Sequence, residues 1–176
     1  MKLSRDFICE SLEIEEAKKL NSFMLLNKER FAVYLPKTLA QNLTISASKV
    51  YILRKKEEHK TQLQFTFAIK ENDSKVVVGL IILKNIDREL QQAEFAYCIG
   101  EKYGGKGLTS KAVQNVIDFA FNELNITTFE IIVHKTNIGS SRVAEKNGFI
   151  WQETLLKEFT PPNKEPLDME LYILLK

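Results

Sequence analysis

The sequence predicts a mixed α/β domain of the α+β type. Apolar residues recur at helical spacing in the first third of the chain, and the middle then changes to the alternation that is typical of strands. A glycine-rich loop next separates a strand from a long amphipathic helix. With 176 residues, 44% of them hydrophobic, we expect one compact domain over residues 1–176.

The first 60 residues are expected to be helical. Ser11 is the candidate N-cap of a first helix with an apolar stripe over 17–24, and Pro36 marks a break after it. Thr38 followed by Gln41 has the form of a capping box for a second helix. Its apolar face would consist of Leu39, Leu43, Ala47, Val50 and Leu53. The charged run 54–60 mixes both signs, which indicates a solvated face without function.

The period changes to two after Leu63, where apolar residues at 63, 65, 67 and 69 alternate with polar or small ones. Asn72 and Asp73 signal a turn, and the β-branched run 76–83 completes a predicted hairpin. A third strand is expected over 93–99, directly before the glycine loop.

After the loop, one apolar stripe at three- and four-residue steps predicts a helix over 108–124. A strand over 129–134 is followed by a short helix that begins near Ser140 and ends at Gly148, a candidate left-handed C-cap. Two last strands, 149–159 and 167–174, flank a turn at Pro161 and Pro162.

Composition disfavours several classes of protein. Twenty-five basic and 23 acidic residues give a net charge of +2, so we expect no direct binding to nucleic acid or membrane. Cys9 and Cys98 lie far apart and the chain has two histidines, so no metal site is expected. The longest apolar run, 76–83, is shorter than the about 20 residues of a spanning helix, and no signal peptide is evident. These features favour a cytoplasmic protein with reduced thiols.

The loop with Gly104, Gly105 and Gly107 is the candidate anion site. Glycine tolerates positive φ and lets backbone pass close to a ligand, so several N–H groups can converge on one phosphate. The helix that follows adds its unpaired N–H groups and positive dipole end. The spacing fits neither a P-loop nor a Rossmann fingerprint. The alternative is a tight strand-to-helix turn with no ligand.

Two motifs carry a resemblance to a known family. The segment from Lys102 to Gly107 resembles the pyrophosphate signature Gln/Arg-x-x-Gly-x-Gly/Ala of the GNAT acetyltransferase superfamily, with Lys102 in place of Gln or Arg. Extended to Ala112, the string GKGLTSKA resembles the RimJ/RimL branch, which acetylates the N-termini of ribosomal proteins. The segment from Asn137 to Phe149 resembles the NxxSxRVxEKxGF motif of the same branch, in the correct order. Weaker similarity covers the chain from about Val76 to its end.

The resemblance implies the GNAT acyl-CoA N-acyltransferase fold, in which helices flank a central mixed sheet that is twisted and mostly antiparallel, with one splayed parallel pair. It implies acetyl-CoA as co-substrate and no metal. The backbone N–H of Ile99 would meet the acetyl carbonyl, Asn137 would orient pantetheine, and Lys146 would pair with a coenzyme phosphate. The coenzyme-binding loop implied by the motif comprises Lys102, Tyr103, Gly104, Gly105, Lys106, Gly107, Leu108 and Thr109. For Asn137 and Lys146, a local turn contact and a solvated side chain are the alternatives.

Acetyl transfer also needs a base for the amine and an acid for the departing thiolate. We favour Glu94 as the base, against the alternative of an ordinary strand-surface carboxylate. Many GNAT enzymes place a tyrosine acid where this chain has Ala144, so the resemblance leaves Ser140 or water; Ser140 as a helix cap is the alternative. Cys98 raises a ping-pong alternative with an acetyl-cysteine, but we prefer direct transfer, and His134 is expected to serve packing.

The acceptor favoured by the resemblance is a protein or peptide N-terminal α-amine, such as that of a ribosomal protein. An α-amine has a pKa of about 7.7 to 8.0, against about 10.4 for lysine, so a weak base suffices. The alternatives are a small amine (a polyamine, an amino acid or an aminoglycoside) and a non-catalytic acetyl-CoA-binding module. A monomer or a homodimer is expected.

Overall fold

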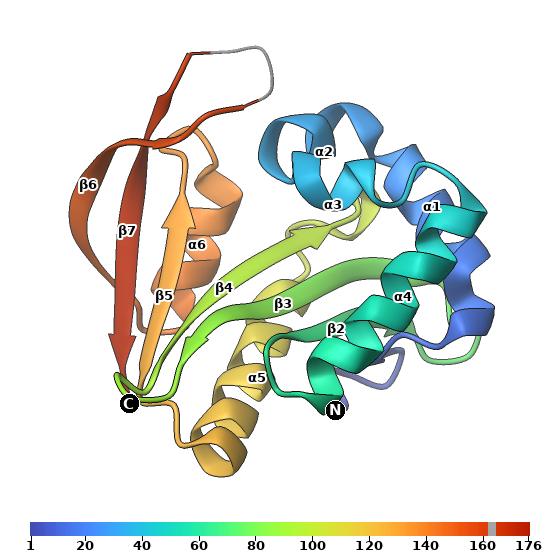
Figure 1. Ribbon diagram of the computed structural model, residues 1–176, viewed down its shortest axis with the longest axis horizontal. Coiled ribbons are helices and arrows are strands. Elements are labelled where there is room, and N and C mark those ends of the chain that lie inside the picture. Colours follow the sequence, from blue (N-terminus) through green and yellow to red (C-terminus); the bar gives the residue numbers. More distant parts are fainter. Residues whose placement is uncertain (162–164) are drawn as a thin grey trace. The chain divides into compact units, whose positions relative to one another are not determined.

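A computed structural model of the protein describes residues 1–161 and 165–176 (Figure 1). The helices and strands, in chain order, are β1 Phe7–Ser11, η1 Ile14–Glu16, α1 Ala17–Leu26, α2 Lys28–Tyr34, α3 Pro36–Ala40, α4 Ile45–Lys60, β2 Phe65–Glu71, β3 Val77–Asp87, β4 Gln92–Ile99, η2 Glu101–Tyr103, α5 Leu108–Leu124, β5 Thr128–Val133, α6 Ile138–Lys146, β6 Ile150–Phe159 and β7 Leu167–Leu175. None of the helices in these residues is long and apolar enough to cross a membrane.

The described strands form one seven-stranded sheet in the order β1-β2-β3-β4-β5-β7-β6. The pairs β1/β2, β5/β7 and β6/β7 are antiparallel, and β4/β5 is parallel. This confirms the predicted mixed α/β class with one parallel pair. The parallel register runs from Gln92 opposite Thr128 to Phe95 opposite Ile131, and β4 continues beyond it to Ile99.

Two compact units divide the chain. The first comprises residues 1–82 and 97–112, and the second comprises 83–96 and 113–176. Because β3, β4 and α5 each contribute residues to both units, the boundary passes through regular elements and not through linkers. The single domain over 1–176 stays a prediction.

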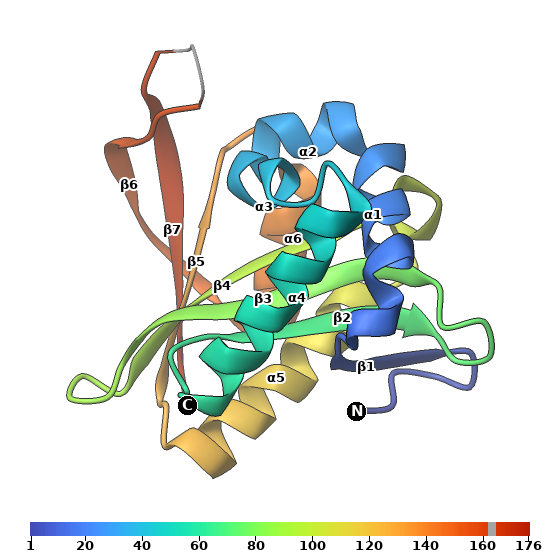
Figure 2. The same ribbon diagram turned by 45° about the vertical axis from the view of Figure 1, so that its right-hand side comes forward.

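The core of the first unit lies where α1 and α4 pack together and α4 packs on β2. Figure 2 shows these two helices side by side in front of β2. The β2 strand is buried at every position from Phe65 to Lys70, so it is covered on both faces. The alternating pattern therefore predicted a strand correctly, but the polar and small residues of this strand are buried as well as the apolar ones.

The predicted helix cap at Ser11 is wrong. Ser11 is the last residue of β1, a strand that the sequence patterns did not predict, and it pairs with Phe67 of β2. Helical structure begins three residues later, at Ile14, where the N-cap Glu13 and Glu16 form a reciprocal capping box. The backbone of Ser11 is thus committed to sheet pairing, so its hydroxyl does not mark the start of the helix.

The second predicted helix is interrupted. Pro36 occupies the first turn of α3 and starts that helix, whereas α4 is capped by Thr44, whose hydroxyl accepts the N–H of Ala47 at 3.1 Å. The capping box assigned to Thr38 is therefore wrong. Val50 and Leu53, placed on the apolar face, are 67% and 54% exposed. The face that α4 buries instead consists of Ser48, Tyr51 and Ile52.

Buried polar side chains determine which face of α4 is turned toward the core. Asn42 is fully buried between α3 and α4, where its Nδ2 donates to the carbonyl of Thr38 at 2.9 Å. Its Oδ1 accepts the hydroxyl of Ser48 at 2.8 Å, and its backbone carbonyl accepts Nδ2 of Asn21 at 2.8 Å. Satisfying these groups turns Ser48 inward, which moves Val50 and Leu53 toward solvent. The charged run 54–60 is largely solvated, as predicted, and includes ion pairs of Arg54 and Lys55 with Glu58.

The second unit contains the β6/β7 hairpin and α6, which packs on β5 (Figure 1). The ring of Phe95 lies 5.8 Å from that of Phe129 and 6.4 Å from that of Phe149. The predicted bounds of α5 are confirmed, and Gly148 follows α6 with the predicted left-handed backbone, at a φ of 82°. Of the turn expected at Pro161 and Pro162, the second proline lies outside the described residues.

Removing Glu16 should destabilise the protein more than removing an exposed ion pair. Lys70 is 1% exposed, and its ammonium lies 2.5 Å from Glu16, 2.9 Å from the carbonyl of Ser11 and 3.4 Å from Glu10. Glu16→Gln leaves this buried charge without its closest counter-charge, so we expect a loss of about 3 kcal/mol in the free energy of unfolding by urea. The control Lys56→Ala, which breaks the exposed pair with Glu13, should change it much less. Equal effects would contradict this account.

Candidate active site

The predicted phosphate loop joins β4 to α5 within the first unit. Gly105 and Gly107 both have a φ of 74°, which is the left-handed region that favours glycine. Gly104 has a φ of −63°, so it does not share this requirement. A Cβ added at Gly105 or Gly107 would meet no other heavy atom of the described chain within 4 Å. These two glycines are therefore required for backbone conformation and not for space.

The loop presents donors and positive charge. The N–H of Lys111 donates to the carbonyl of Gly107 at 3.1 Å, so Gly107 accepts the first intrahelical bond of α5. By helix geometry, the N–H groups of Leu108, Thr109 and Ser110 then have no acceptor within the helix. The loop residues 104–107 are exposed, as are the side chains of Lys102 and Lys106. An anion is thus the ligand that this segment suits.

The side chain of Tyr103 anchors the loop. Its hydroxyl donates to Glu71 Oε1 at 2.8 Å, and its ring meets that of Phe7 edge-on at 6.0 Å. The hydrogen bond to Glu71 raises the pKa of Tyr103, and the ammonium of Lys106 lies 5.3 Å from the ring centroid. The side chain therefore fastens the loop to β1 and β2. The N–H groups of Tyr103 and Gly104 donate to the carbonyls of Gly100 and Glu101, at 2.9 Å and 3.1 Å, so the predicted coenzyme contact falls to the residues after them.

The end of β4 is held by residues that sequence reasoning missed. The guanidinium of Arg30 donates to the carbonyl of Ile99, and Asn27 Oδ1 accepts the N–H of Glu101 at 3.1 Å. Between them, the N–H of Gly100 donates to the carbonyl of Val78 on β3 at 2.7 Å. Asn27 and Arg30 belong to no motif, so the sequence offered no signal for them.

In the second unit, the carboxylate of the predicted base, Glu94, is held from both sides. Lys84 Nζ lies 2.6 Å from one oxygen, and Asn85 Nδ2 donates to the other at 2.7 Å. Asn85 has a φ of 50°, a left-handed conformation that asparagine tolerates within the irregular end of β3. The side chain of Glu94 is only 12% exposed. Its carboxylate is thus held in one orientation by two partners and does not rotate freely as a surface group would.

A second carboxylate lies opposite Glu94. The parallel register pairs Glu94 with Glu130 of β5, and directly opposite residues of paired strands project to the same face. Burial raises the pKa of Glu130, a hydrogen bond from Gln92 lowers it, and the charge of Glu94 raises it again. A raised pKa is a property of general acids and bases. Sequence reasoning missed Glu130 because only the register brings the two carboxylates together.

The residues of the second motif lie around α6. Asn137 caps this helix, because its Oδ1 accepts the N–H of Ser140 at 3.3 Å. The alternative in which Ser140 itself is the cap is therefore wrong, and Ser140 lies in the first turn. Lys146 is exposed in the last turn, and Ala144 is fully buried. His134 makes a local contact, 2.7 Å from the hydroxyl of Thr136.

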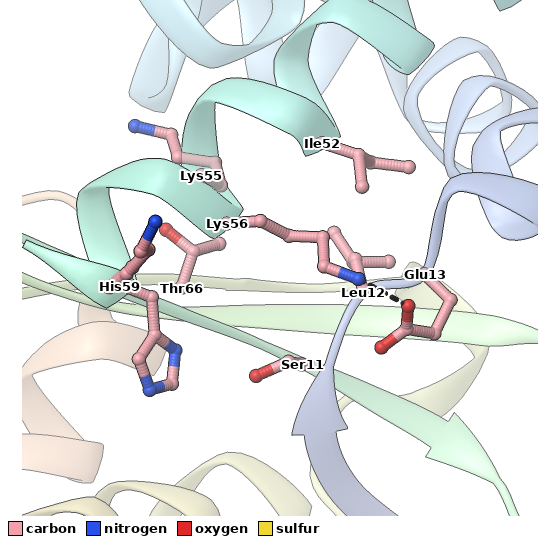
Figure 3. Close-up of a pocket in the computed structure, with 9 residues that line it drawn as sticks. Ser11, Leu12, Glu13, Ile52, Lys55, Lys56, His59 and Thr66 are labelled. Atoms are coloured by element: carbon pink, nitrogen blue, oxygen red, sulfur yellow. Dashed lines mark hydrogen bonds and ion pairs between the residues drawn. The ribbon is translucent and has the colours of Figure 1, made fainter.

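A cavity of about 280 Å³ lies elsewhere in the first unit (Figure 3). It is lined by Ser11, Leu12, Glu13, Ile52, Lys55, Lys56, His59, Lys60 and Thr66. None of the site residues predicted from the sequence lines it. Among residues 1–161 and 165–176, no group of three His, Cys, Asp or Glu side chains is close enough to hold a metal ion.

The family to which this loop and helix belong follows from comparison with known proteins. The acetyltransferase (GNAT) domain family matches residues 10–150, which is most of the chain. The chain belongs to the GNAT acetyltransferase family. This match confirms the resemblance seen in the two motifs. Acetyl-CoA is the co-substrate of GNAT acetyltransferases.

Two curated relatives are N-acetyltransferases. The chain is 33% identical to the uncharacterized N-acetyltransferase p20 of Bacillus licheniformis over 113 residues, which cover 64% of this chain and 62% of that protein. It is 35% identical to spermidine N(1)-acetyltransferase of Escherichia coli K12 over 81 residues, which cover 46% of this chain and 44% of that enzyme. The matched segments thus span 62% and 44% of the length of these two relatives.

Solved structures share the fold over nearly the whole chain. Ribosomal-protein-S5-alanine acetyltransferase from Vibrio fischeri superposes with a TM-score of 0.90 at 22% identity, covering 98% of this chain and 94% of that one. The microcin C7 self-immunity acetyltransferase MccE, in complex with acetyl-CoA and AMP, gives 0.90 at 20% identity, covering 100% and 96%. RimL, the ribosomal L7/L12 α-N-protein acetyltransferase, in complex with coenzyme A, gives 0.90 at 17%, covering 99% and 96%.

Replacing either left-handed glycine should weaken acetyl-CoA binding. An alanine at Gly105 or Gly107 costs about 1–2 kcal/mol at positive φ, and the loop relieves that strain by moving its N–H groups. Since about 1.4 kcal/mol is a factor of ten, we expect Gly105→Ala and Gly107→Ala to lose about tenfold or more in affinity by calorimetry. Gly139→Ala is the matched control, because Gly139 does not have a positive φ and an added Cβ would lie 3.9 Å from the nearest atom. Unchanged affinity in folded loop variants would refute the phosphate loop.

Cys98 should not carry the acetyl group. It is 9% exposed, and burial raises the pKa of its thiol to about 12, so the thiol stays protonated at neutral pH. We expect Cys98→Ala to retain most of its activity. Cys9→Ala is the control, because burial also raises the pKa of that thiol to about 12. An acetyl adduct on Cys98 by mass spectrometry, together with an inactive Cys98→Ala, would establish the ping-pong route instead.

Proposed function

We propose that this protein is an acetyl-CoA-dependent N-acetyltransferase that acetylates the N-terminal α-amine of a protein or peptide. The observation that carries the coenzyme half of this proposal is the pair of left-handed glycines at the N-terminus of α5. Family membership supports the reaction type.

The coenzyme contacts that we propose follow the two motifs. Backbone N–H groups from Gly105 to Thr109 bind the pyrophosphate, because those of Tyr103 and Gly104 donate to the carbonyls of Gly100 and Glu101 within η2. The ammonium groups of Lys102 and Lys106 add positive charge. Ile99 donates its N–H to the acetyl carbonyl. Asn137 uses its Oδ1 as a helix cap, so its Nδ2 is the group that contacts pantetheine. Lys146 pairs with a phosphate of the coenzyme.

In the proposed chemistry the acetyl group moves directly. The unprotonated amine nitrogen attacks the thioester carbonyl, the C–N bond forms, and the C–S bond breaks. Glu94 takes the proton of the amine, directly or through water. The N–H of Ile99 stabilises the oxyanion, and the departing thiolate takes a proton from Ser140 or water.

Two considerations support an α-amine acceptor. An N-terminal amine is partly unprotonated near neutral pH, so it makes little demand on a base. The motifs GKGLTSKA and NIGSSRVAEKNGF are also similar to those of the RimJ/RimL branch, and RimL acts as a ribosomal L7/L12 α-N-protein acetyltransferase. A ribosomal protein N-terminus is accordingly the first acceptor to test.

A small polyamine is the second candidate acceptor. The spermidine N(1)-acetyltransferase of Escherichia coli is 35% identical over the matched segment. The opposed carboxylates of Glu94 and Glu130 are also groups that attract a cationic amine.

The acceptor class can be decided with two peptides and one small amine. We expect a lysine-free peptide with a free N-terminus to be acetylated, and an N-terminally blocked peptide with an internal lysine to react far more slowly. Spermidine is the third acceptor, and liberated thiol is the readout. Activity on the blocked peptide or spermidine alone would exclude the α-amine, and inactivity with all three would favour a binding module.

The same assay tests the base. Glu94→Gln should lower kcat by about 10²-fold or more if Glu94 is the general base. Glu130→Gln is the matched control, because it removes the same charge from the paired position on β5. A larger loss in Glu130→Gln than in Glu94→Gln would transfer the role to Glu130.

A further inference from the structure

We infer that Asn27 and Arg30 are positioning residues, which hold the end of β4 so that the N–H of Ile99 points at the acetyl carbonyl. This inference rests on the proposed function, because it concerns the same coenzyme site. It assigns a role to two residues at the junction of α1 and α2, outside both GNAT motifs.

The end of β4 needs support because its ladder stops there. Ile99 is the last residue of the strand, and η2 begins at Glu101. On the β3 side, the N–H of Gly100 still reaches the carbonyl of Val78 at 2.7 Å. The carbonyl of Ile99 and the N–H of Glu101 bond instead to side chains, those of Arg30 and Asn27. Two side chains thus supply the hydrogen bonds that a neighbouring strand would otherwise make with Ile99 and Glu101.

Asn27 is fixed in this position by its own helix. It is the residue between α1 and α2, and its Nδ2 donates to the carbonyl of Phe23 in the last turn of α1 at 2.8 Å. That bond satisfies a C-terminal carbonyl and orients the amide, so Oδ1 faces the N–H of Glu101 at 3.1 Å. One amide therefore connects the end of α1 to the backbone that follows β4.

Arg30 is oriented by two contacts besides the one to Ile99. Its Nη2 lies 3.4 Å from Asn27 Oδ1, and its Cζ lies 5.3 Å from the centroid of the Phe31 ring. Phe31 is 2% exposed and meets the ring of Phe23 edge-on at 5.3 Å, so it provides a rigid support. A guanidinium held in this way makes a charge-assisted hydrogen bond, which is stronger and more directional than a neutral one.

This arrangement predicts a loss of rate without a loss of coenzyme affinity. The pyrophosphate donors come from the loop and α5, and Asn27 and Arg30 bond to residues before that loop. Releasing the end of β4 should therefore leave phosphate binding intact, while the N–H of Ile99 no longer points at the acetyl carbonyl. A displacement of about 1 Å at a reacting centre can cost about 10²-fold in rate.

The kinetic test compares Arg30→Ala and Asn27→Ala with Arg54→Ala. Arg54 is a matched control, because it also lies over an aromatic ring, that of Tyr51 at 5.8 Å, and bonds to an amide side chain, that of Gln41, but on α4. We expect Arg30→Ala to lower kcat by about tenfold or more, with coenzyme A affinity by calorimetry within about threefold of wild type. Arg30→Lys should recover part of the rate, because an ammonium can still donate to the carbonyl of Ile99.

Two results would overturn the inference. One is a loss of kcat in Arg30→Ala and Asn27→Ala no larger than in Arg54→Ala. The other is a parallel fall of coenzyme A affinity and kcat, which a merely structural role would produce.

Hydrogen exchange separates this inference from the proposed function, because it needs no acceptor. In the wild type, acetyl-CoA should slow exchange of the Ile99 amide more than coenzyme A does, and Arg30→Ala should abolish that difference. If the wild type acetylates no amine, the proposed function fails while this readout still decides the inference. Equal protection in wild type and Arg30→Ala would overturn it.

Discussion

The candidate coenzyme site depends on a backbone constraint, the positive φ of Gly105 and Gly107. A residue with a Cβ would pay about 1–2 kcal/mol at each position, so only glycine holds this conformation without strain. Backbone in this conformation can direct several N–H groups toward one anion, and α5 begins directly after the loop with its own unpaired N–H groups. The lysines at 102 and 106 add charge to a site that backbone alone defines. This is why the loop could be found from sequence, since glycine spacing directly reports backbone geometry.

Local signals predicted local structure well. The helix α5 was predicted over its observed bounds because its apolar stripe is long and the loop before it is marked by glycines. The left-handed Gly148 and the strands of the second half follow from similarly short-range patterns. In contrast, β1 has only five residues, and what makes it a strand is its pairing with β2, about 60 residues further along the chain. Ser11 was misassigned for the same reason.

Buried polar groups explain most of the remaining differences. An apolar stripe assumes that hydrophobic residues face inward, but α4 turns Ser48 inward to satisfy Asn42 and exposes Leu53. The end of β4 shows the same principle, since Asn27 and Arg30 satisfy backbone groups that the ladder leaves. Such partners are far apart in sequence and have no periodicity. They become visible only once the fold brings them together.

The chemistry that these residues support bears on the choice of acceptor. Position 144 holds a fully buried alanine where the resemblance would place a tyrosine acid, and the carboxylates of Glu94 and Glu130 lie opposite each other on β4 and β5 of the second unit. At pH 7 about a tenth of an α-amine with a pKa near 8 is unprotonated, against about 0.04% of a lysine with a pKa of 10.4. That ratio of a few hundred corresponds to about 3 kcal/mol in the activation free energy. An enzyme that acetylates lysine must recover this difference, whereas an enzyme that acetylates an α-amine need not. Under the proposed function we expect orientation of the acetyl group to be the larger part of the task, and Asn27 and Arg30, which hold the end of β4, are the residues that we infer to support it.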